Sequence, residues 1–171
     1  IQEMAKHTGF VEATARLPES FREKRADEEL VLRFFAVTLF RKMYKGNIEE
    51  WLDSFMEDIL FGRLRFDLLS ERQRFDAVFD LISKTLGNEA FTRFNDGGLA
   101  VGRLAPAYYE ASVCAFDSNL EGISNRDPLE VKRQLQAAFS DQRFLAATGP
   151  GANTFEKLEQ RIAVVSEYLS K

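Results

Sequence analysis

Apolar residues recur three or four positions apart along most of the chain, the spacing that places side chains on one face of an α-helix. The clearest run lies in the first third of the chain, directly after Asn47, a residue type that caps helix N-termini. We therefore predict an amphipathic helix over residues 48–60. Its apolar stripe consists of Ile48, Trp51, Leu52, Phe55, Met56, Ile59 and Leu60.

The same spacing predicts further helices on both sides of this one. The helix before it has apolar side chains on more than one face, so we expect several neighbours to contact it. Pro106 fits only the first turn of a helix and places one start near Leu104, and Asp127-Pro128 has the order of cap and proline that marks another. The predicted helices cover residues 27–44, 48–60, 70–86, 103–116, 127–139, 140–147 and 154–169, with a helical turn over 89–94.

We predict that the segments between these helices are loops. No segment has the strict alternation of polar and apolar residues that is typical of a strand. The segment from Thr8 to Ala26 is polar and contains Pro18, and Asn95-Asp96-Gly97-Gly98 predicts a second, flexible loop. The predicted fold class is therefore all-α, a single orthogonal or irregular bundle of six to seven helices. We expect one helical domain over residues 1–171, with residues 1–26 partly loop, and, because the sequence begins at Ile1, a fragment of a larger protein.

Composition and charge narrow the classes of function. The 171 residues include 23 basic and 27 acidic side chains, and the net charge of −4 argues against a sequence-independent DNA binder. There is no run of about 18 apolar residues and no signal-peptide stretch, so we expect no membrane contact and a cytoplasmic location. Cys114 and His7 are single residues of their types, too few for a zinc cluster, a Ser-His-Asp triad or an HNH nuclease centre. His7 is expected to be exposed.

No catalytic set can be assembled from the remaining residues. A motif of the metal-dependent nuclease type is formed by Asp127, Glu130 and Lys132, but these residues fall in the first turns of one predicted helix. Glu130 and Lys132 would point about 200° apart there, so they cannot converge on one ion. We expect no catalytic residue, no metal ligand and no cofactor in this chain.

Arginine supplies 15 of the 23 basic residues, and its planar head binds phosphates and carboxylates through paired hydrogen bonds. Structural ion pairs are the alternative role for these side chains. The candidates for contact with phosphate or nucleic acid are Arg63, Arg65, Arg72 and Arg74, which are interleaved with phenylalanines, and Arg93 and Arg103, which flank the glycine loop.

Two charged residues lie in apolar surroundings. Arg33 falls among Leu30, Phe34 and Val37, and we expect it to pair with Glu29 one turn earlier or with an acid on another helix. Glu110 follows two tyrosines and is expected to form a structural salt bridge with Arg33 or Arg103. Cys114, on the same predicted helix, is expected to be a small core residue.

A family resemblance is carried by several short blocks in a fixed order. They are Arg25-Ala26-Asp27-Glu28-Glu29-Leu30-Val31-Leu32-Arg33-Phe34-Phe35-Ala36, Tyr44-Lys45-Gly46, the helix with Trp51-Leu52 and Phe55-Met56, Ala90-Phe91-Thr92-Arg93, Gly102-Arg103-Leu104-Ala105-Pro106-Ala107-Tyr108-Tyr109-Glu110-Ala111, Phe144-Leu145-Ala146-Ala147-Thr148-Gly149 with Asn153, and Arg161-Ile162. The pattern resembles the helical C-terminal half of the ParB-like, GmrSD-type restriction and phage-defence proteins, and the resemblance covers residues 1–170.

The resemblance implies a scaffold without its catalytic parts. In that family an N-terminal ParB-like half carries an Asp-Gly-Gln-Gln-Arg motif, and the whole protein is associated with nucleotide hydrolysis and with restriction of modified phage DNA. That motif is absent from this chain. The resemblance carries over Arg25, Asp27, Arg33, Tyr44, Arg93, Arg103 and Glu110 as structural or interface positions and not as catalysts.

Two functions from different classes remain. The first is an interaction module that packs on the ParB-like half of the same protein, with a homodimer as a further partner. Such a module should expose an apolar patch larger than a monomer usually tolerates. The second is a stand-alone adaptor or nucleic-acid-binding module, in which the arginines contact DNA and binding weakens steeply with salt.

Overall fold

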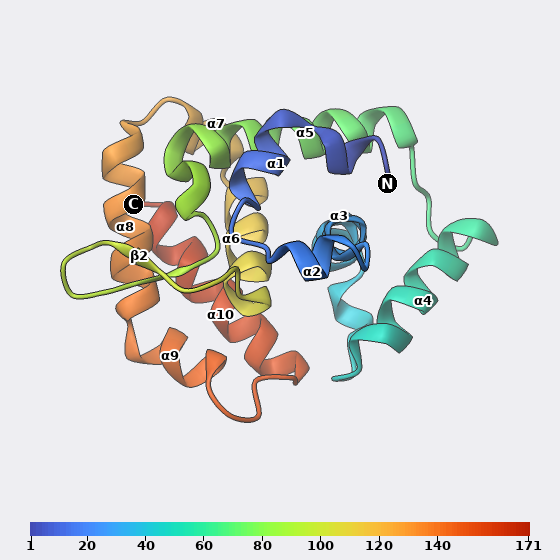
Figure 1. The fold of residues 1–171 in the computed structure, drawn as a ribbon. Helices are drawn as coiled ribbons and strands as arrows, with labels where there is room; N and C mark the ends of the chain where they lie inside the picture. Colours follow the sequence, from blue (N-terminus) through green and yellow to red (C-terminus); the bar gives the residue numbers. More distant parts are fainter.

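The computed structural model describes all residues from Ile1 to Lys171 and is mostly helical, with ten α-helices, three short 3₁₀ helices and one small hairpin (Figure 1). The α-helices are α1 Thr8–Ala13, α2 Glu19–Arg22, α3 Ala26–Leu39, α4 Ile48–Leu60, α5 Leu68–Leu86, α6 Pro106–Ser118, α7 Leu120–Ser124, α8 Pro128–Ser140, α9 Gln142–Thr148 and α10 Phe155–Leu169. The 3₁₀ helices are η1 Met4–Lys6, η2 Arg41–Met43 and η3 Gly87–Glu89, and strands β1 Arg93–Phe94 and β2 Ala100–Val101 pair antiparallel.

Helix α6 lies at the centre of the fold. Every residue from Tyr108 to Phe116 is buried, because α10, α3 and α5 all pack against this helix. Helices α8 and α9 complete the far side of α10. The buried apolar residues form one continuous cluster, and phenylalanine rings fill much of it. In Figure 1, α5 crosses the top of the molecule and α4 stands apart on the right, beyond α3.

Several helix starts agree with the sequence-based prediction because local chemistry determines them. The Asn47 side chain accepts hydrogen bonds from the backbone N–H groups of Glu49 and Glu50, and Asp127 accepts one from Leu129 N–H. Helix α6 begins at Pro106, two residues later than expected, since Ala105 still has an extended backbone. The helix predicted over 27–44 ends at Leu39, and η2 follows it.

The predicted number of helices and the loop over residues 8–26 are wrong. Helices α1 and α2 occupy that segment, where Phe10 and Ala13 are fully buried and α1 packs on α5. Burial against a neighbouring helix stabilises α1, which is too short to be stable alone. Helix α7, with five residues, also raises the number above seven.

The predicted absence of strands is also incorrect. Residues 93–101 form a hairpin, where a helical turn and a loop were expected. The side chain of Asn95 accepts hydrogen bonds from the N–H groups of Gly97 and Leu99, and Gly98 adopts a positive φ of 73°. This turn chemistry brings β1 and β2 together although each strand has only two residues.

Gly9 sets the close approach of α1 to α5. A Cβ atom at this position would lie 2.8 Å from the backbone oxygen of Phe79. We therefore expect Gly9→Ala to lower the free energy of unfolding by about 1–3 kcal/mol through overpacking, measured by urea denaturation. Gly122 in α7 is the matched control, because a Cβ there meets no atom within 4 Å. An equal loss in both variants would show that the approach to α5 is not the cause.

None of the helices combines the length and the apolar character that crossing a membrane requires.

Candidate functional site

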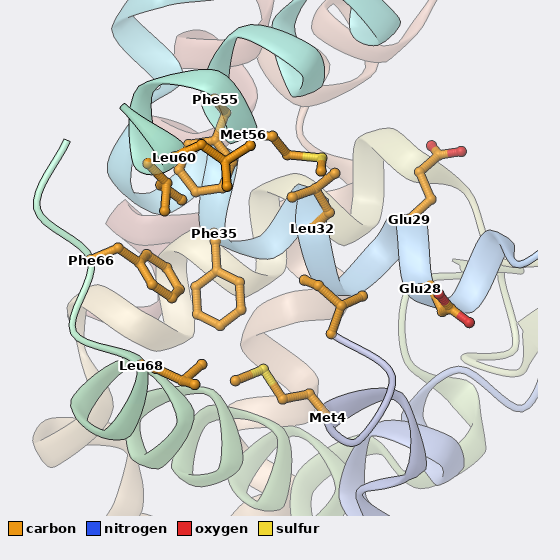
Figure 2. Close-up of a pocket in the computed structure, with 12 residues that line it drawn as sticks. Met4, Glu28, Glu29, Leu32, Phe35, Phe55, Met56, Leu60, Phe66 and Leu68 are labelled. Atoms are coloured by element: carbon orange, nitrogen blue, oxygen red, sulfur yellow. The ribbon is translucent and has the colours of Figure 1, made fainter. Parts of the chain in front are cut away.

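An apolar groove of about 470 Å³ lies between α3, α4 and the start of α5 (Figure 2). Phe35 of α3 lies at its centre, Met56 and Leu60 of α4 border one side, and Leu68 borders the other. Ten of the twelve lining residues are hydrophobic. The full lining is Ile1, Met4, Glu28, Glu29, Leu32, Phe35, Phe55, Met56, Ile59, Leu60, Phe66 and Leu68.

Aromatic packing holds the base of the groove in shape. Phe66, in the segment between α4 and α5, packs edge-on against Phe35, with 5.1 Å between the ring centroids. The Phe66 and Phe55 centroids are 6.4 Å apart. Phe35 and Phe55 are fully buried, so these rings anchor α4 to α3 while the outer part of the groove stays open.

The outer part of the groove leaves large apolar side chains in contact with solvent. Met56 is 45%, Leu68 64% and Leu60 78% exposed. Phe61 and Leu69, next to the groove along the chain, are also exposed. Monomeric soluble proteins rarely leave a contiguous apolar surface of this kind uncovered, and such surfaces mark interaction sites. The sequence predicts a single inner stripe for residues 48–60, but only part of that stripe faces the core.

One end of the groove is acidic. Glu28 and Glu29 of α3 lie beside the apolar lining, as Figure 2 shows. Glu28 lies 3.9 Å from Arg25, which is exposed and precedes α3 with a positive φ of 61°. Asp27 accepts a hydrogen bond from Glu28 N–H, so Arg25 and Asp27 shape the start of α3 and lie outside the groove lining.

A buried ion network lies behind the acidic end. Glu110 of α6 accepts a hydrogen bond from Arg33 of α3 at 3.1 Å and a second from Arg161 of α10, one on each carboxylate oxygen. Arg33 also donates to Glu29 at 2.5 Å, and Arg161 donates to the carbonyl oxygen of Ala152 at 3.0 Å. Both predicted partners of Arg33 are therefore correct, while Arg103 takes no part.

Tyr44 borders this network. It is buried, and no partner atom lies within hydrogen-bond distance of its hydroxyl group. Burial raises the pKa of the Tyr44 phenol, the nearby Glu110 carboxylate raises it further, and Arg161 and Arg33 act in the opposite direction. Its ring lies 5.0 Å from that of Trp51, so Tyr44 connects the network with α4.

Arg161 belongs to one of the blocks that carry the family resemblance, but the sequence analysis predicted no ion pair for it. Its neighbours one turn away, Leu158 and Val165, are apolar, and this spacing places the arginine on the buried face of α10. The same spacing argument identified Arg33, so it could also have identified Arg161 as a buried charged residue. The groove had no comparable signal, because periodicity cannot tell a stripe covered by the core from one left open.

The four arginines from 63 to 74 do not form one cationic surface. Arg63 pairs with Asp58 at 2.6 Å, and Arg74 pairs with Glu71 at 2.7 Å and with Asp117 at 3.0 Å. Arg72 lies 3.8 Å from Asp76. Burial raises the pKa of the Asp117 carboxyl, although the Arg74 charge acts in the opposite direction. Three of the four charges are thus paired with carboxylates.

The other three candidate arginines form no salt bridge with a carboxylate. Arg65 lies between α4 and α5, Arg93 lies in β1, and Arg103 follows β2; all three are exposed and none forms an ion pair. In the hairpin, Arg93 pairs with Val101, two residues before Arg103. They remain candidates for phosphate contact.

Reactive side chains are not grouped. No set of three or more His, Cys, Asp or Glu side chains could hold a metal ion. Cys114 is buried, and burial raises its pKa well above its usual range, so the thiol stays protonated at neutral pH. His7, expected to be exposed, instead lies partly buried, with Nε2 2.7 Å from Asp80 and Nδ1 3.5 Å from Asp76.

Comparison with known proteins returns no relative for this chain: no family model, curated protein or solved structure matches it. The resemblance to the GmrSD-type proteins therefore stays a prediction from sequence.

Proposed function

We propose that this chain is a helical interaction domain and that the apolar groove is its docking surface. The observation that carries the proposal is the exposure of Met56, Leu60 and Leu68 around a cavity with an almost entirely apolar lining. The resemblance to the GmrSD-type family suggests the ParB-like half of a restriction or phage-defence protein as the occupant. On this proposal, the NTPase or endonuclease chemistry belongs to the parent protein, and this chain supplies the scaffold.

The shape and charge of the groove suggest what the docking segment looks like. An amphipathic helix can lay apolar side chains into a groove lined by residues such as Leu32 and Phe35. Glu28 and Glu29 at one end favour a basic residue at the matching end of that segment, since opposite charges improve orientation and association rate. The expected occupant is therefore an apolar helical segment that carries lysine or arginine near one terminus.

Site-specific photocrosslinking in the natural full-length protein tests the proposal. A photoreactive residue at position 60 should crosslink to a discrete segment of the ParB-like half, identified by mass spectrometry. The matched control is position 129, because Leu129 of α8 is exposed to a similar extent, 67% against 78%, and lies outside the groove. Crosslinking that is equally weak or equally scattered from both positions would contradict docking at the groove.

A charge in the groove should weaken docking without unfolding the domain. We expect Leu60→Glu to weaken the association of this domain with a separately produced ParB-like half by at least about thirtyfold, because the variant places a carboxylate in the apolar contact. Leu129→Glu should leave this association unchanged. Both variants should unfold at the same thermal midpoint as the unsubstituted domain. Analytical ultracentrifugation measures the association, and an unchanged affinity for Leu60→Glu would show that partners bind elsewhere.

A nucleic-acid contact surface is the second candidate, because Arg65, Arg93 and Arg103 are exposed and have no carboxylate partner. Fluorescence anisotropy with duplex DNA at low ionic strength tests it. The logarithm of the affinity should fall with the logarithm of salt concentration, with a slope of about 0.9 for each phosphate contacted. The variant with Arg93→Gln and Arg103→Gln should reduce this slope by about two. If the affinity for DNA is undetectable at low salt, the nucleic-acid role is rejected and docking is the remaining candidate function.

A further inference from the structure

The apolar groove carries opposite charges at its two ends. Figure 2 shows Glu28 and Glu29 at one end and Phe66 at the other, across the ring of Phe35. Arg65 directly precedes Phe66 in the chain, is exposed and forms no salt bridge. One end of the groove is therefore acidic, and the other is next to a basic residue that has no carboxylate partner within the chain.

Large apolar side chains protrude beside the groove. Phe61, at the end of α4, is 70% exposed, and Leu69, in the first turn of α5, is 68% exposed. Neither residue lines the groove, although each directly follows an exposed lining residue, Leu60 or Leu68. The same face of the molecule thus presents both an apolar hollow and uncovered apolar side chains, which is typical of an interaction surface.

The chain itself contains the kind of segment that the groove is expected to bind. Met56 and Leu60 are exposed on the second half of α4, and Arg65 follows five residues after the end of the helix. This order of an apolar helical segment and a basic residue matches the occupant described above, whose basic end lies against Glu28. A second copy of the chain is therefore a partner of the right chemistry.

Glu28 is the acid that is available to a partner's arginine. Glu29 already accepts a hydrogen bond from Arg33 at 2.5 Å, whereas Glu28 lies 3.9 Å from the exposed Arg25. A two-fold rotation about an axis through the middle of the groove brings the acidic end of one copy to the basic end of the other, and the same contact forms twice. Opposite charges at the two ends favour this antiparallel arrangement over a parallel one.

We propose that the groove pairs two copies of this chain about a two-fold axis, with Arg65 of each copy against Glu28 of the other. The inference rests on the proposed docking function, because both interactions use the same surface. A second copy and the ParB-like half compete for the groove, so self-pairing regulates docking. Burial of the apolar side chains supplies the affinity, and the two charge pairs fix the orientation.

Sedimentation equilibrium of the 171-residue chain at increasing concentration tests the dimer. The average mass should rise from that of a monomer to that of a dimer. Arg65→Glu should weaken dimerisation by at least about tenfold, because it turns both contacts with Glu28 into like-charge pairs. Glu28→Lys should have a similar effect, because it places a cation against Arg65 at both ends of the interface.

Mixing these two variants gives the decisive measurement. In a mixed dimer, one end joins the two substituted residues as a pair of opposite charges, and the other end keeps the original pair of Glu28 and Arg65. An equimolar mixture should therefore dimerise as well as the unsubstituted chain, at a concentration where each variant alone is mostly monomeric.

Arg133→Glu is the matched control, because Arg133 of α8 is exposed, forms no salt bridge and lies outside the groove. This variant should leave dimerisation unchanged. Circular dichroism should show the same helical content for all three variants, so that a loss of dimer reports the interface and not the fold.

Three results would overturn the proposal: a chain that stays monomeric at every concentration, a dimer that neither substitution weakens, or a mixture that dimerises no better than either variant alone. Crosslinking from position 60 tests the docking function separately. If the crosslink to the ParB-like half forms while the chain stays monomeric, docking stands and the dimer is rejected. If the dimer forms and the crosslink does not, the groove binds a second copy and docking of the ParB-like half is rejected.

Discussion

Replacing Glu110 with glutamine is expected to lower the free energy of unfolding by about 3–5 kcal/mol, the typical cost of leaving buried charges without a counterion. Glu110 is 2% exposed and is the only carboxylate that contacts both Arg33 and Arg161. Glutamine keeps the size and one acceptor oxygen, so the loss reports the missing charge and not a cavity. Equilibrium urea denaturation at neutral pH measures it, with a slope that should stay close to that of the parent.

Glu121→Gln is the matched control for this variant. Glu121 lies in α7, is exposed and forms no ion pair, so its replacement should change the free energy of unfolding by less than about 0.5 kcal/mol. A loss below about 1 kcal/mol for Glu110→Gln would show that the two arginines do not depend on this carboxylate.

Phe79→Ala is expected to destabilise the fold by a similar amount, about 3–5 kcal/mol. Phe79 of α5 is fully buried, and its ring packs against Phe75 at 4.4 Å, Phe10 at 5.0 Å and Phe34 at 5.7 Å between centroids. Phe10 lies in α1 and Phe34 in α3, so the cavity left behind weakens the contacts of α5 with both of these helices. Both the urea midpoint and the thermal midpoint should fall.

Phe61→Ala controls for the loss of a phenyl ring as such. Phe61 is 70% exposed at the end of α4 and contacts the guanidinium of Arg63. Its replacement should change the free energy of unfolding by less than about 1 kcal/mol. If Phe61→Ala and Phe79→Ala were equally destabilising, the ring cluster around Phe79 would not be the centre of the core.

The sequence-based prediction is accurate where interactions between residues close in the sequence determine the structure, and it fails where residues distant in the sequence determine it. Helices α4, α8 and α10 were predicted to within a residue or two because their caps, Asn47, Asp127 and Thr154, act on residues two or three positions away. Helix α1 was missed because its stability comes from α5, about 70 residues later in the chain. Propensity is a weak guide where a distant surface decides the structure.

The candidate site follows the same rule. The pairing of Arg33 with Glu29 is local and could be predicted, and Arg33 was one of the two partners predicted for Glu110, Arg103 being the other. The contribution of Arg161, 51 residues beyond Glu110, needed the packing of α10 on α6. The groove depends on which face of α4 the core leaves uncovered, and no spacing of residues within 48–60 contains that information.

Helix α4 rests mainly on α3, and its buried side chains Trp51, Leu52 and Phe55 all lie on one face. The indole N–H of Trp51 donates to the carbonyl oxygen of Phe40, which secures the first half of the helix to the end of α3. The second half, with Met56 and Leu60, has no comparable polar attachment. Elements with few buried contacts open locally at low free-energy cost. The groove can therefore widen by fraying of one half-helix while the core around α6 stays intact, so amide exchange should be faster at residues 56–60 than at 108–116.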